Sequence, residues 1–490
     1  MRLFLSIAIC KILYFIGRRM GKGSSLPGRV ALALYPDILK RIKLPKIIIA
    51  VTGSNGKTST TELIAQALRG NGISVEWNRE GANQIEGIAT LILRAASYSG
   101  AVRSDALILE CDERYALQTF RYIKPTIVVI TNLCRDQLTR NGHPEFIQDC
   151  LRAAISTIET VETAAAPSAA DDRPHGENAA GNDSGSIGAK FVLNADDPYV
   201  MALAPNKIQD SENSAPYCYC FGISGNVSPA GAVPRDPLSP CPSGGTYDDG
   251  AFCPVCKERM TYDYRVAGHM GGYRCGACGH MRRKPEIEVT GYNSETGEVT
   301  LTGGITTRLA FPSLTGVYNT AAAIAAAAAA GAGAENAARV LDGYELTGGR
   351  TLHFSIGGSD GILLISKHEN SLSYNQSLAW AVGRGRRCTV VIMVDSISRK
   401  YYTGETSWLW DIDFGLLADD CVKNIVLTGR YINELAVRFA MTAIDPDKII
   451  YLAEPGGLRG YLEGSAAGNI YAITCFADKD KLLRGVIGSK

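Results

Sequence analysis

A glycine-rich loop that joins a strand-like run to a helical segment limits the possible folds of this chain more than any other feature. The β-branched run 46–51 leads into Thr-Gly-Ser-Asn-Gly-Lys-Thr at 52–58, and a helical pattern follows directly. In this context backbone N–H groups and a helix N-terminus bind phosphate, Lys57 neutralises its charge and the Thr58 hydroxyl can hold Mg²⁺. Val51 occupies the first glycine position of the usual P-loop spacing, so a glycine turn with an exposed lysine is the alternative.

Further apolar runs predict the sheet to which this loop belongs. Runs at 106–109 and 126–130 alternate with helical segments, which is typical of a parallel α/β sheet. Glu110 directly follows the first run, at the carboxyl edge where such sheets bind ligands, and is a candidate Mg²⁺ ligand. A solvated strand end is the alternative. A composition change at 345–352 precedes a second alternation of strands and helices, which predicts a smaller C-terminal α/β unit.

The composition narrows the class of protein. The 50 Lys and Arg residues balance 49 Asp and Glu, which argues against a strong general attraction to nucleic acid. A hydrophobic fraction of 46% is ordinary for a globular protein, and the low-complexity segment 162–188 predicts a disordered surface insertion. Fourteen cysteines in 490 residues indicate free thiols in a reducing cytoplasm rather than a disulfide framework.

The N-terminus carries an apolar stretch, 3–16, that is shorter than the roughly 20 residues of a membrane-spanning helix. Arg18, Arg19 and Lys22 follow it in place of a small-residue cleavage site, so a signal peptide is not expected. The first interpretation is an amphipathic helix packed on its own domain. The alternative is a helix that lies at the inner, cytoplasmic surface of the cell membrane with its basic residues toward lipid.

Two Cys-x-x-Cys pairs, separated by eighteen residues, predict a zinc ribbon in an insertion at 248–285. Four thiolates close the tetrahedral coordination sphere and leave no position for a catalytic water, so the predicted Zn²⁺ is structural. A pair of redox dithiols is the alternative. His269 and His280 lie close by in the sequence, and we expect them to be solvated or to support the ligands indirectly. The predicted ligands are Cys253, Cys256, Cys275 and Cys278.

Several of these motifs together resemble the Mur ligase family. The segment 52–60 resembles the shortened P-loop of Mur ligases, and 131–138 resembles the segment where these enzymes usually carry Asp-His. Gln137 replaces that His. The chain resembles the MurT group, the ligase subunits of lipid II isoglutaminyl synthases, in this substitution, in the cysteine module and in Ser-Trp-Leu-Trp-Asp at 407–411.

The resemblance extends from residue 23 nearly to the end and implies an α/β fold in three parts. A helical lead-in occupies 1–45, and a Mur ligase-like P-loop central domain with the inserted four-cysteine zinc ribbon occupies 46–348. A smaller Rossmann-like C-terminal domain of the MurT type follows at 349–490.

The activity implied by the resemblance is ATP-dependent amidation of the D-glutamate α-carboxylate of the lipid II stem peptide, which yields D-isoglutamine in peptidoglycan synthesis. ATP phosphorylates the carboxylate, and ammonia from a GatD-like glutaminase partner in a heterodimer attacks the acyl phosphate. Six histidines and no cysteine in a nucleophile-elbow setting agree with an external nitrogen source. The alternatives are an amino-acid-adding ligase of the Mur or folylpolyglutamate type, and an ATP-binding scaffold for a glutaminase.

Where a motif of this chain matches the family, the resemblance implies a role for each matched residue. Lys57 and Arg350 would offset charge on the transferring phosphoryl group, and Thr58 and Glu110 would hold Mg²⁺. Without the resemblance, Arg350 would be a capping or solvated arginine. The nucleotide-binding residues implied are Gly53, Ser54, Asn55, Gly56, Lys57, Thr58, Ser59, Asn194, Asp196, Asn319 and Arg350.

The C-terminal domain departs from the family pattern at two places. Lys367 is retained with Asn375 and Gln376, but the usual Pro-Ala-Gly turn between them is missing. The family is thought to lend a carboxylate to the glutaminase Cys-His pair, and Glu405 is the position we expect to supply it. Asp411 and Asp413 are the next candidates, and an exposed loop acid is the alternative. Thr139, where the family often has Asp, leaves the acceptor pocket unassigned.

Overall fold

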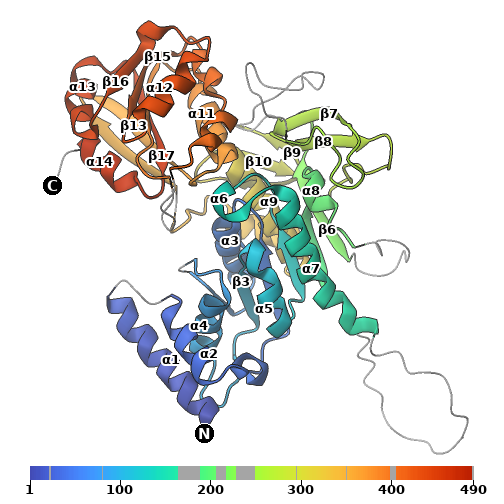
Figure 1. The fold of residues 1–490 in the computed structure, drawn as a ribbon. Coiled ribbons are helices and arrows are strands. Elements are labelled where there is room, and N and C mark those ends of the chain that lie inside the picture. The colour runs from blue at the N-terminus through green and yellow to red at the C-terminus, as the bar shows by residue number, and fades with distance from the viewer. Residues whose placement is uncertain are drawn as a thin grey trace, which may run out of the picture.

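Two α/β units, each built around its own sheet, make up the described part of the chain (Figure 1). The predicted insertion 162–188 lies outside the described residues except for its ends, and the fold class expected from the sequence, α/β, is confirmed. The computed structural model describes residues 1–20, 24–79, 81–163, 188–205, 217–227, 249–293, 295–348, 350–397 and 404–487.

The central unit contains a nine-stranded mixed sheet with the order β11-β10-β9-β6-β5-β4-β1-β3-β2. Strands from β2 to β9 in this order pair in parallel, and β10 and β11 extend one edge in antiparallel orientation. The strands are β1 (Ile47–Thr52), β2 (Val75–Trp77), β3 (Ala106–Glu110), β4 (Ile127–Ile130), β5 (Lys190–Asn194), β6 (Cys218–Ile223), β9 (Ile287–Tyr292), β10 (Glu298–Leu301) and β11 (Ile305–Arg308).

Helices cover both faces of this sheet, and β1 is therefore apolar from Ile47 to Val51. Ile48 and Ala50 point into the core on the side of α4, α5 and α7, whereas Ile49 and Val51 point into the core on the side of α3 and α9. The helices are α3 (Lys57–Gly70), α4 (Ile85–Ala95), α5 (Ala116–Tyr122), α6 (Leu138–Asn141), α7 (Pro144–Thr163), α8 (Pro198–Met201), α9 (Leu314–Ala329) and α10 (Ala334–Leu341).

The N-terminal lead-in consists of α1 (Arg2–Arg19) and α2 (Leu26–Leu34), which pack on α4. The α2–α4 contact is close because it occurs at a glycine. The backbone N–H of Gly28 donates to Thr90 Oγ1 at 2.8 Å, and a Cβ on Gly28 would lie 1.9 Å from the Glu86 carbonyl oxygen. In the described ranges, no helix combines the length and apolarity that a bilayer crossing requires.

The C-terminal unit contains a six-stranded sheet with the order β12-β13-β17-β14-β15-β16, in which only β12 is antiparallel to its neighbour. Its strands are β12 (Thr351–Ile356), β13 (Ser359–Ser366), β14 (Cys388–Met393), β15 (Val422–Thr428), β16 (Ile449–Leu452) and β17 (Asn469–Cys475). Its helices are α11 (Ser371–Val382), α12 (Ile432–Ala440), α13 (Leu458–Ser465) and α14 (Lys479–Ile487).

A two-stranded antiparallel hairpin, β7 (Met260–Ala267) and β8 (Met270–Cys275), is inserted in the chain between β6 and β9. In Figure 1 it lies beside the central unit, close to α8 and on the side that faces the C-terminal unit. The hairpin carries the cysteine module.

Candidate active site

The phosphate loop lies between β1 and α3 and depends on two glycines. Gly53 and Gly56 have φ values of +126° and +85°, a region that residues with a Cβ rarely adopt. A Cβ would lie 2.4 Å from Thr131 Oγ1 at the first position and 2.2 Å from Asn319 Oδ1 at the second. The loop ends at Lys57, where the backbone N–H groups of a 14-residue helix begin, and this combination suits an anion.

The carboxyl end of β4 holds the loop in place. Asn132 Oδ1 accepts the backbone N–H of Asn55 at 3.0 Å, and Asn132 Nδ2 donates to the Asn55 carbonyl at 3.1 Å. The Thr131 hydroxyl donates to the same carbonyl at 2.6 Å. The segment 131–138, which resembles a Mur ligase motif, therefore supports the phosphate loop directly.

Lys57 is buried, with 8% of its surface exposed, and forms an ion pair with Glu113 at 2.9 Å. Its Nζ also donates to the Gly53 carbonyl, so the side chain curls back under the loop. Burial lowers the pKa of Lys57, but the Glu113 and Asp136 carboxylates raise it above its usual value, and the amine is charged. Burial raises the pKa of Glu113, but Lys57 lowers it below its ordinary value, so both partners are ionised.

The predicted Mg²⁺ ligands Glu110 and Thr58 lie together at the edge of the sheet. Burial raises the pKa of Glu110, while Lys57 and the Thr58 hydroxyl act in the opposite direction. Glu110 Oε1 accepts from Asn83 Nδ2 at 3.3 Å, but the buried Oε2 has no hydrogen-bond partner among the described residues. An unpartnered carboxylate oxygen beside a hydroxyl is a donor set that fits Mg²⁺.

Side chains of the C-terminal unit contact the phosphate loop and the segment that supports it. Lys367 Nζ donates to the Ser54 carbonyl at 2.9 Å and forms an ion pair with Asp136 of the central unit. Asn370 Nδ2 donates to Asp136 Oδ1 at 2.9 Å, and Asn55 Nδ2 donates to Asn370 Oδ1 at 3.4 Å. The two units therefore meet at the predicted phosphate site.

Arg350 lies at the connection between the two units, immediately before β12, and its side chain is exposed. Its backbone carbonyl accepts the N–H of Ile365, which fixes the start of the C-terminal sheet. Desolvation of the guanidinium lowers the pKa of Arg350, and the Asp136 and Glu110 carboxylates act in the opposite direction.

Three acids are candidates for the carboxylate that the family lends to its glutaminase partner, and they lie in different environments. Glu405 is exposed and accepts the Ser407 backbone N–H at 2.8 Å, a hydrogen bond that lowers the pKa of its carboxyl. Asp411 forms an ion pair with Arg135 at 3.3 Å, and burial raises its pKa. The backbone N–H of Asp413 donates to Asn375 Oδ1 at 2.8 Å. Of the three, only Glu405 is exposed to solvent.

Asn194 and Asp196 are buried at the end of β5 and contact protein groups. Asn194 Nδ2 donates to the Thr131 carbonyl at 2.9 Å, which connects β5 to the segment that supports the loop. Asp196 forms an ion pair with Arg282 at 2.7 Å and accepts from the Tyr318 hydroxyl at 2.8 Å. Asn194 therefore supports the loop through Thr131, whereas Asp196 is held by Arg282 and Tyr318.

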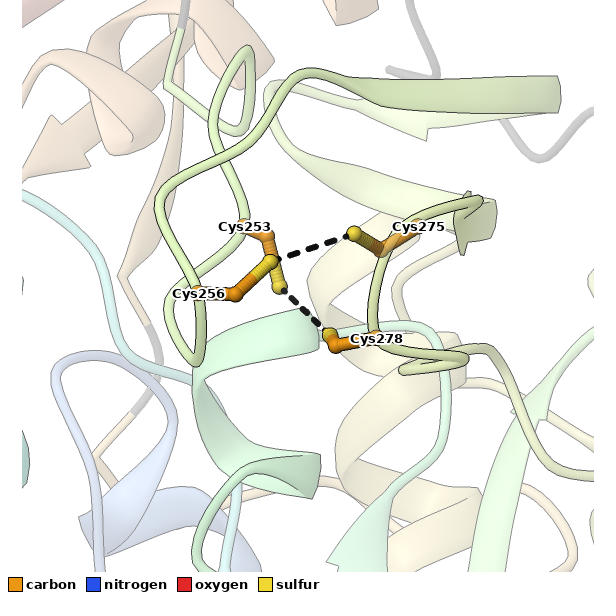
Figure 2. Close-up of side chains that lie close together, drawn as sticks. All are labelled: Cys253, Cys256, Cys275 and Cys278. Atoms are coloured by element: carbon orange, nitrogen blue, oxygen red, sulfur yellow. Dashed lines mark hydrogen bonds between the residues drawn. The ribbon is translucent and has the colours of Figure 1, made fainter.

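The four predicted zinc ligands form one cluster (Figure 2). Their sulfur atoms all lie within 4.8 Å of one another, close to the separation of about 3.8 Å that tetrahedral Zn–S bonds of about 2.3 Å require. Each Cys-x-x-Cys turn closes through a residue with positive φ, Lys257 in one and Gly279 in the other, whose N–H donates to the carbonyl of the first cysteine. The cluster fits structural zinc. It consists of Cys253, Cys256, Cys275 and Cys278.

The cysteine module docks on the segment that follows β5. His280 Nε2 donates to the Pro198 carbonyl at 2.9 Å, and His269 Nε2 lies 3.2 Å from an Asp197 carboxylate oxygen. Asp197 also accepts the backbone N–H of Leu133 at 2.7 Å. Both histidines thus face the central unit, and the module is connected through Asp197 to the strand end that supports the phosphate loop.

Sequence reasoning did not assign the roles of Glu113 or Asp136. Glu110 ends β3 and two further acids, Asp112 and Glu113, follow it, and only the turn at η2 (Glu113–Tyr115) decides that Glu113 pairs with Lys57. The sequence shows Lys367 as a lysine that the family also has. Its partner, Asp136, is 231 positions away, and no local pattern identifies this pair.

The close approach at Gly56 leads to a prediction. We expect Gly56→Ala to weaken ATP binding at least about tenfold, because its Cβ displaces Asn319 and the loop must adopt a strained φ. Gly72→Ala is the matched control, since Gly72 has φ +80° but nothing lies within 4 Å of an added Cβ. Calorimetric titration with ATP measures both variants, and equal affinity for the two would contradict the expectation.

Comparisons with known proteins agree with this geometry. A family model described as "MurT ligase C-terminal" matches residues 368–467, and one described as "Mur ligase middle domain" matches 51–166. The MurT subunit of lipid II isoglutaminyl synthase (glutamine-hydrolyzing) from Streptococcus pneumoniae is 28% identical over 89% of this chain and 86% of its own length. The corresponding subunit from Staphylococcus aureus strain COL is 22% identical over 92% and 90%.

A similar fold is present among solved structures. A pseudomurein peptide ligase type C from Methanothermus fervidus superposes with a TM-score of 0.64 over 92% of this chain and 80% of that one, at 19% identity. The likeness therefore extends across both α/β units.

Proposed function

The chain belongs to the MurT group of Mur ligases, and on that premise we propose that it amidates the D-glutamate α-carboxylate of the lipid II stem peptide with ATP. The observation that carries the proposal is the junction of the two units at the phosphate loop. Lys367 and Asn370 of the C-terminal unit contact Ser54, Asn55 and Asp136, so the nucleotide site is completed by both units.

The residues of the site have distinct roles in the proposed reaction. The loop N–H groups and Lys57 hold the triphosphate, and Arg350 approaches the transferring phosphoryl group as the units close. Mg²⁺, held by Thr58 and Glu110, would neutralise phosphate oxygens. Closure also excludes water, which would otherwise hydrolyse the acyl phosphate before ammonia attacks it. ATP as co-substrate places the reaction in the cytoplasm.

The ligase reaction can be tested without a partner. The purified chain is incubated with ATP, Mg²⁺, lipid II and ammonium chloride, and the product is examined by mass spectrometry. An amidated stem peptide with matching ADP release supports the proposal. Turnover with a free amino acid in place of ammonium would favour the amino-acid-adding alternative. ATP binding without any turnover, also in the presence of glutamine and a glutaminase, would favour the scaffold alternative.

We further propose a heterodimer with a GatD-like glutaminase that supplies ammonia, with Glu405 as the carboxylate that orients the partner's catalytic histidine. Its exposure and the lowered pKa of its carboxyl support this choice over Asp411, which is paired with Arg135. A carboxylate in this role keeps the imidazole in its reactive tautomer and orientation.

We therefore expect Glu405→Gln to lower the rate of glutamine-dependent amidation by about 10²-fold or more relative to the ammonium-dependent rate. The ratio of the two rates in the assembled complex is the measurement. Asp420→Asn, a change at an exposed acid elsewhere in the C-terminal unit, is the control and should leave the ratio unchanged. An unchanged ratio in Glu405→Gln would contradict the assignment.

A further inference from the structure

Helix α1 is apolar on both faces, and only one face is covered. Ile7 and Cys10 are fully buried where α1 packs on α2 and α4. A helix that is apolar all round is normally buried all round, so this outer face is unusual for a surface helix. The outer face presents large side chains that are about half exposed, namely Phe4, Leu5, Ile12, Phe15 and Ile16.

The lead-in that carries this face is strongly basic. The first 46 residues contain ten Lys and Arg residues and a single acid, Asp37, whereas the remainder of the chain holds 40 basic and 48 acidic residues. Arg18 and Arg19 form the last turn of α1, at the end of the apolar face. A long apolar stripe bordered by cations and free of acids matches the boundary of an anionic bilayer.

A surface hollow beside α1 adds a second, independent observation. The hollow has a volume of about 490 Å³ and is lined by Lys11, Arg103 and the hydroxyl-bearing residues Ser97, Tyr98 and Ser99. Two cations and neighbouring hydroxyl groups are the chemistry that holds a phosphate ester.

Tyr98 joins the hollow to the apolar face. Its ring lies 5.1 Å from the ring of Phe4, and Lys11 Nζ lies 5.0 Å from the ring centroid. Tyrosine favours the membrane–water boundary, because its ring is apolar and its hydroxyl is hydrated. The hollow thus adjoins the outer face of α1, and a lipid headgroup would be within reach of it if that face entered the interface.

We propose that the outer face of α1 and the hollow between Lys11 and Arg103 together form a docking surface for an anionic membrane, with a lipid phosphate in the hollow. The proposal rests on the proposed function for its purpose, since lipid II is a membrane-bound acceptor. Helix α4, on which α1 and α2 pack, begins next to Asn83, and Asn83 donates to Glu110 in the candidate metal site. Docking would therefore place the catalytic edge at a fixed position relative to the bilayer.

Vesicle flotation tests the docking directly. The full chain should bind vesicles of phosphatidylglycerol and phosphatidylcholine, bind pure phosphatidylcholine at least tenfold less well, and lose anionic binding as salt rises. The variant Phe4→Ser/Ile12→Ser/Phe15→Ser should reduce binding at least tenfold. Val437→Ser/Met441→Ser removes exposed apolar side chains from the region of α12 and is the matched control, which should bind like the wild type.

A second variant, Lys11→Gln/Arg103→Gln, tests the hollow separately. It should weaken binding to anionic vesicles and leave the weak binding to phosphatidylcholine unchanged. Equal thermal melts for all variants establish that each one is folded. Absence of vesicle binding by the wild type would overturn the proposal. A concentration-dependent dimer or a complex with the glutaminase that the triple variant abolishes, without any vesicle binding, would also overturn it and assign the face to a protein.

Failure of the proposed function is distinguishable from failure of docking. A water-soluble stem-peptide acceptor without the lipid is amidated in solution by the wild type and by the triple variant at equal rates if both proposals hold. In that case only the rate on vesicle-embedded lipid II falls in the triple variant. Vesicle binding together with no amidation of either acceptor would leave docking intact and refute the proposed activity.

Discussion

Replacing Lys57 with alanine is expected to lower ATP-dependent amidation by about 10³-fold or more. Lys57 is the buried cation of the phosphate loop, and charge placed in advance at a transferring phosphoryl group contributes on this scale. The variant also leaves Glu113 buried without its ion-pair partner, which costs about 3–5 kcal/mol of stability. ADP release and product mass measure the rate, and a thermal melt measures the stability.

The two effects of this substitution can be separated. Lys57→Met/Glu113→Gln removes both charges of the pair, so we expect it to recover most of the lost stability but none of the activity. Lys46→Ala, which removes an exposed lysine just before β1, should leave both quantities unchanged. If Lys57→Ala retained turnover, the assignment of the phosphate loop would be wrong.

Loss of the predicted zinc is expected to have the second large effect. Cys253→Ser/Cys278→Ser removes two of the four sulfur ligands and should lower the melting temperature by about 10 °C, because the module holds buried charges in the central unit. Arg282, just beyond the second Cys-x-x-Cys, pairs with the fully buried Asp196, and a displaced module would leave that carboxylate without its cation.

We also expect weaker ATP binding in the zinc-free variant, although no cysteine is part of the phosphate loop. The docked segment reaches the loop through Asp197, which accepts the N–H of Leu133 next to the residues that hold Asn55. His269→Ala, which removes the contact of the module with Asp197, should weaken ATP binding in the same direction while zinc is retained, which isolates this route. Metal analysis, thermal melts and ATP titration provide the measurements.

A thiol outside the cluster serves as the control for the zinc experiment. Cys150→Ser changes a partly buried cysteine of α7 and should leave zinc content, melting temperature and ATP affinity unchanged. A zinc-free Cys253→Ser/Cys278→Ser variant that melts like the wild type would contradict the structural role. A disulfide within the module under mild oxidation, with no bound zinc, would support the redox alternative.

The Mur ligase-type α/β fold could be predicted from the sequence because its signals are local. The run 46–51 predicted β1, and 106–109 and 126–130 predicted β3 and β4, each within a residue or two of its bounds. These strands are apolar along their length because helices cover both faces of the sheet. The zinc ligands were equally visible, since two residues between paired cysteines is the spacing that the turn requires.

The candidate site was only partly visible in the sequence. The loop and Glu110 could be placed from their positions directly after strand-like runs, but the sequence could not show that Asp196 is held by Arg282 and Tyr318. These contacts depend on the docking of the zinc module. The exposure of the outer face of α1 was likewise not visible in the sequence. Its apolar residues predicted a packed helix, but other elements cover only one side of it.

What the sequence by itself determined is therefore what is encoded within a few residues: the glycine-rich loop, the alternation of strands and helices, and the spacing of the cysteines. Only the tertiary structure decided which acid pairs with Lys57, and that Lys367 closes on Asp136 from 231 positions away. The physical reason is that periodicity and turn geometry act over neighbouring residues. Ion pairs between units depend on how separate layers pack, which no short pattern specifies.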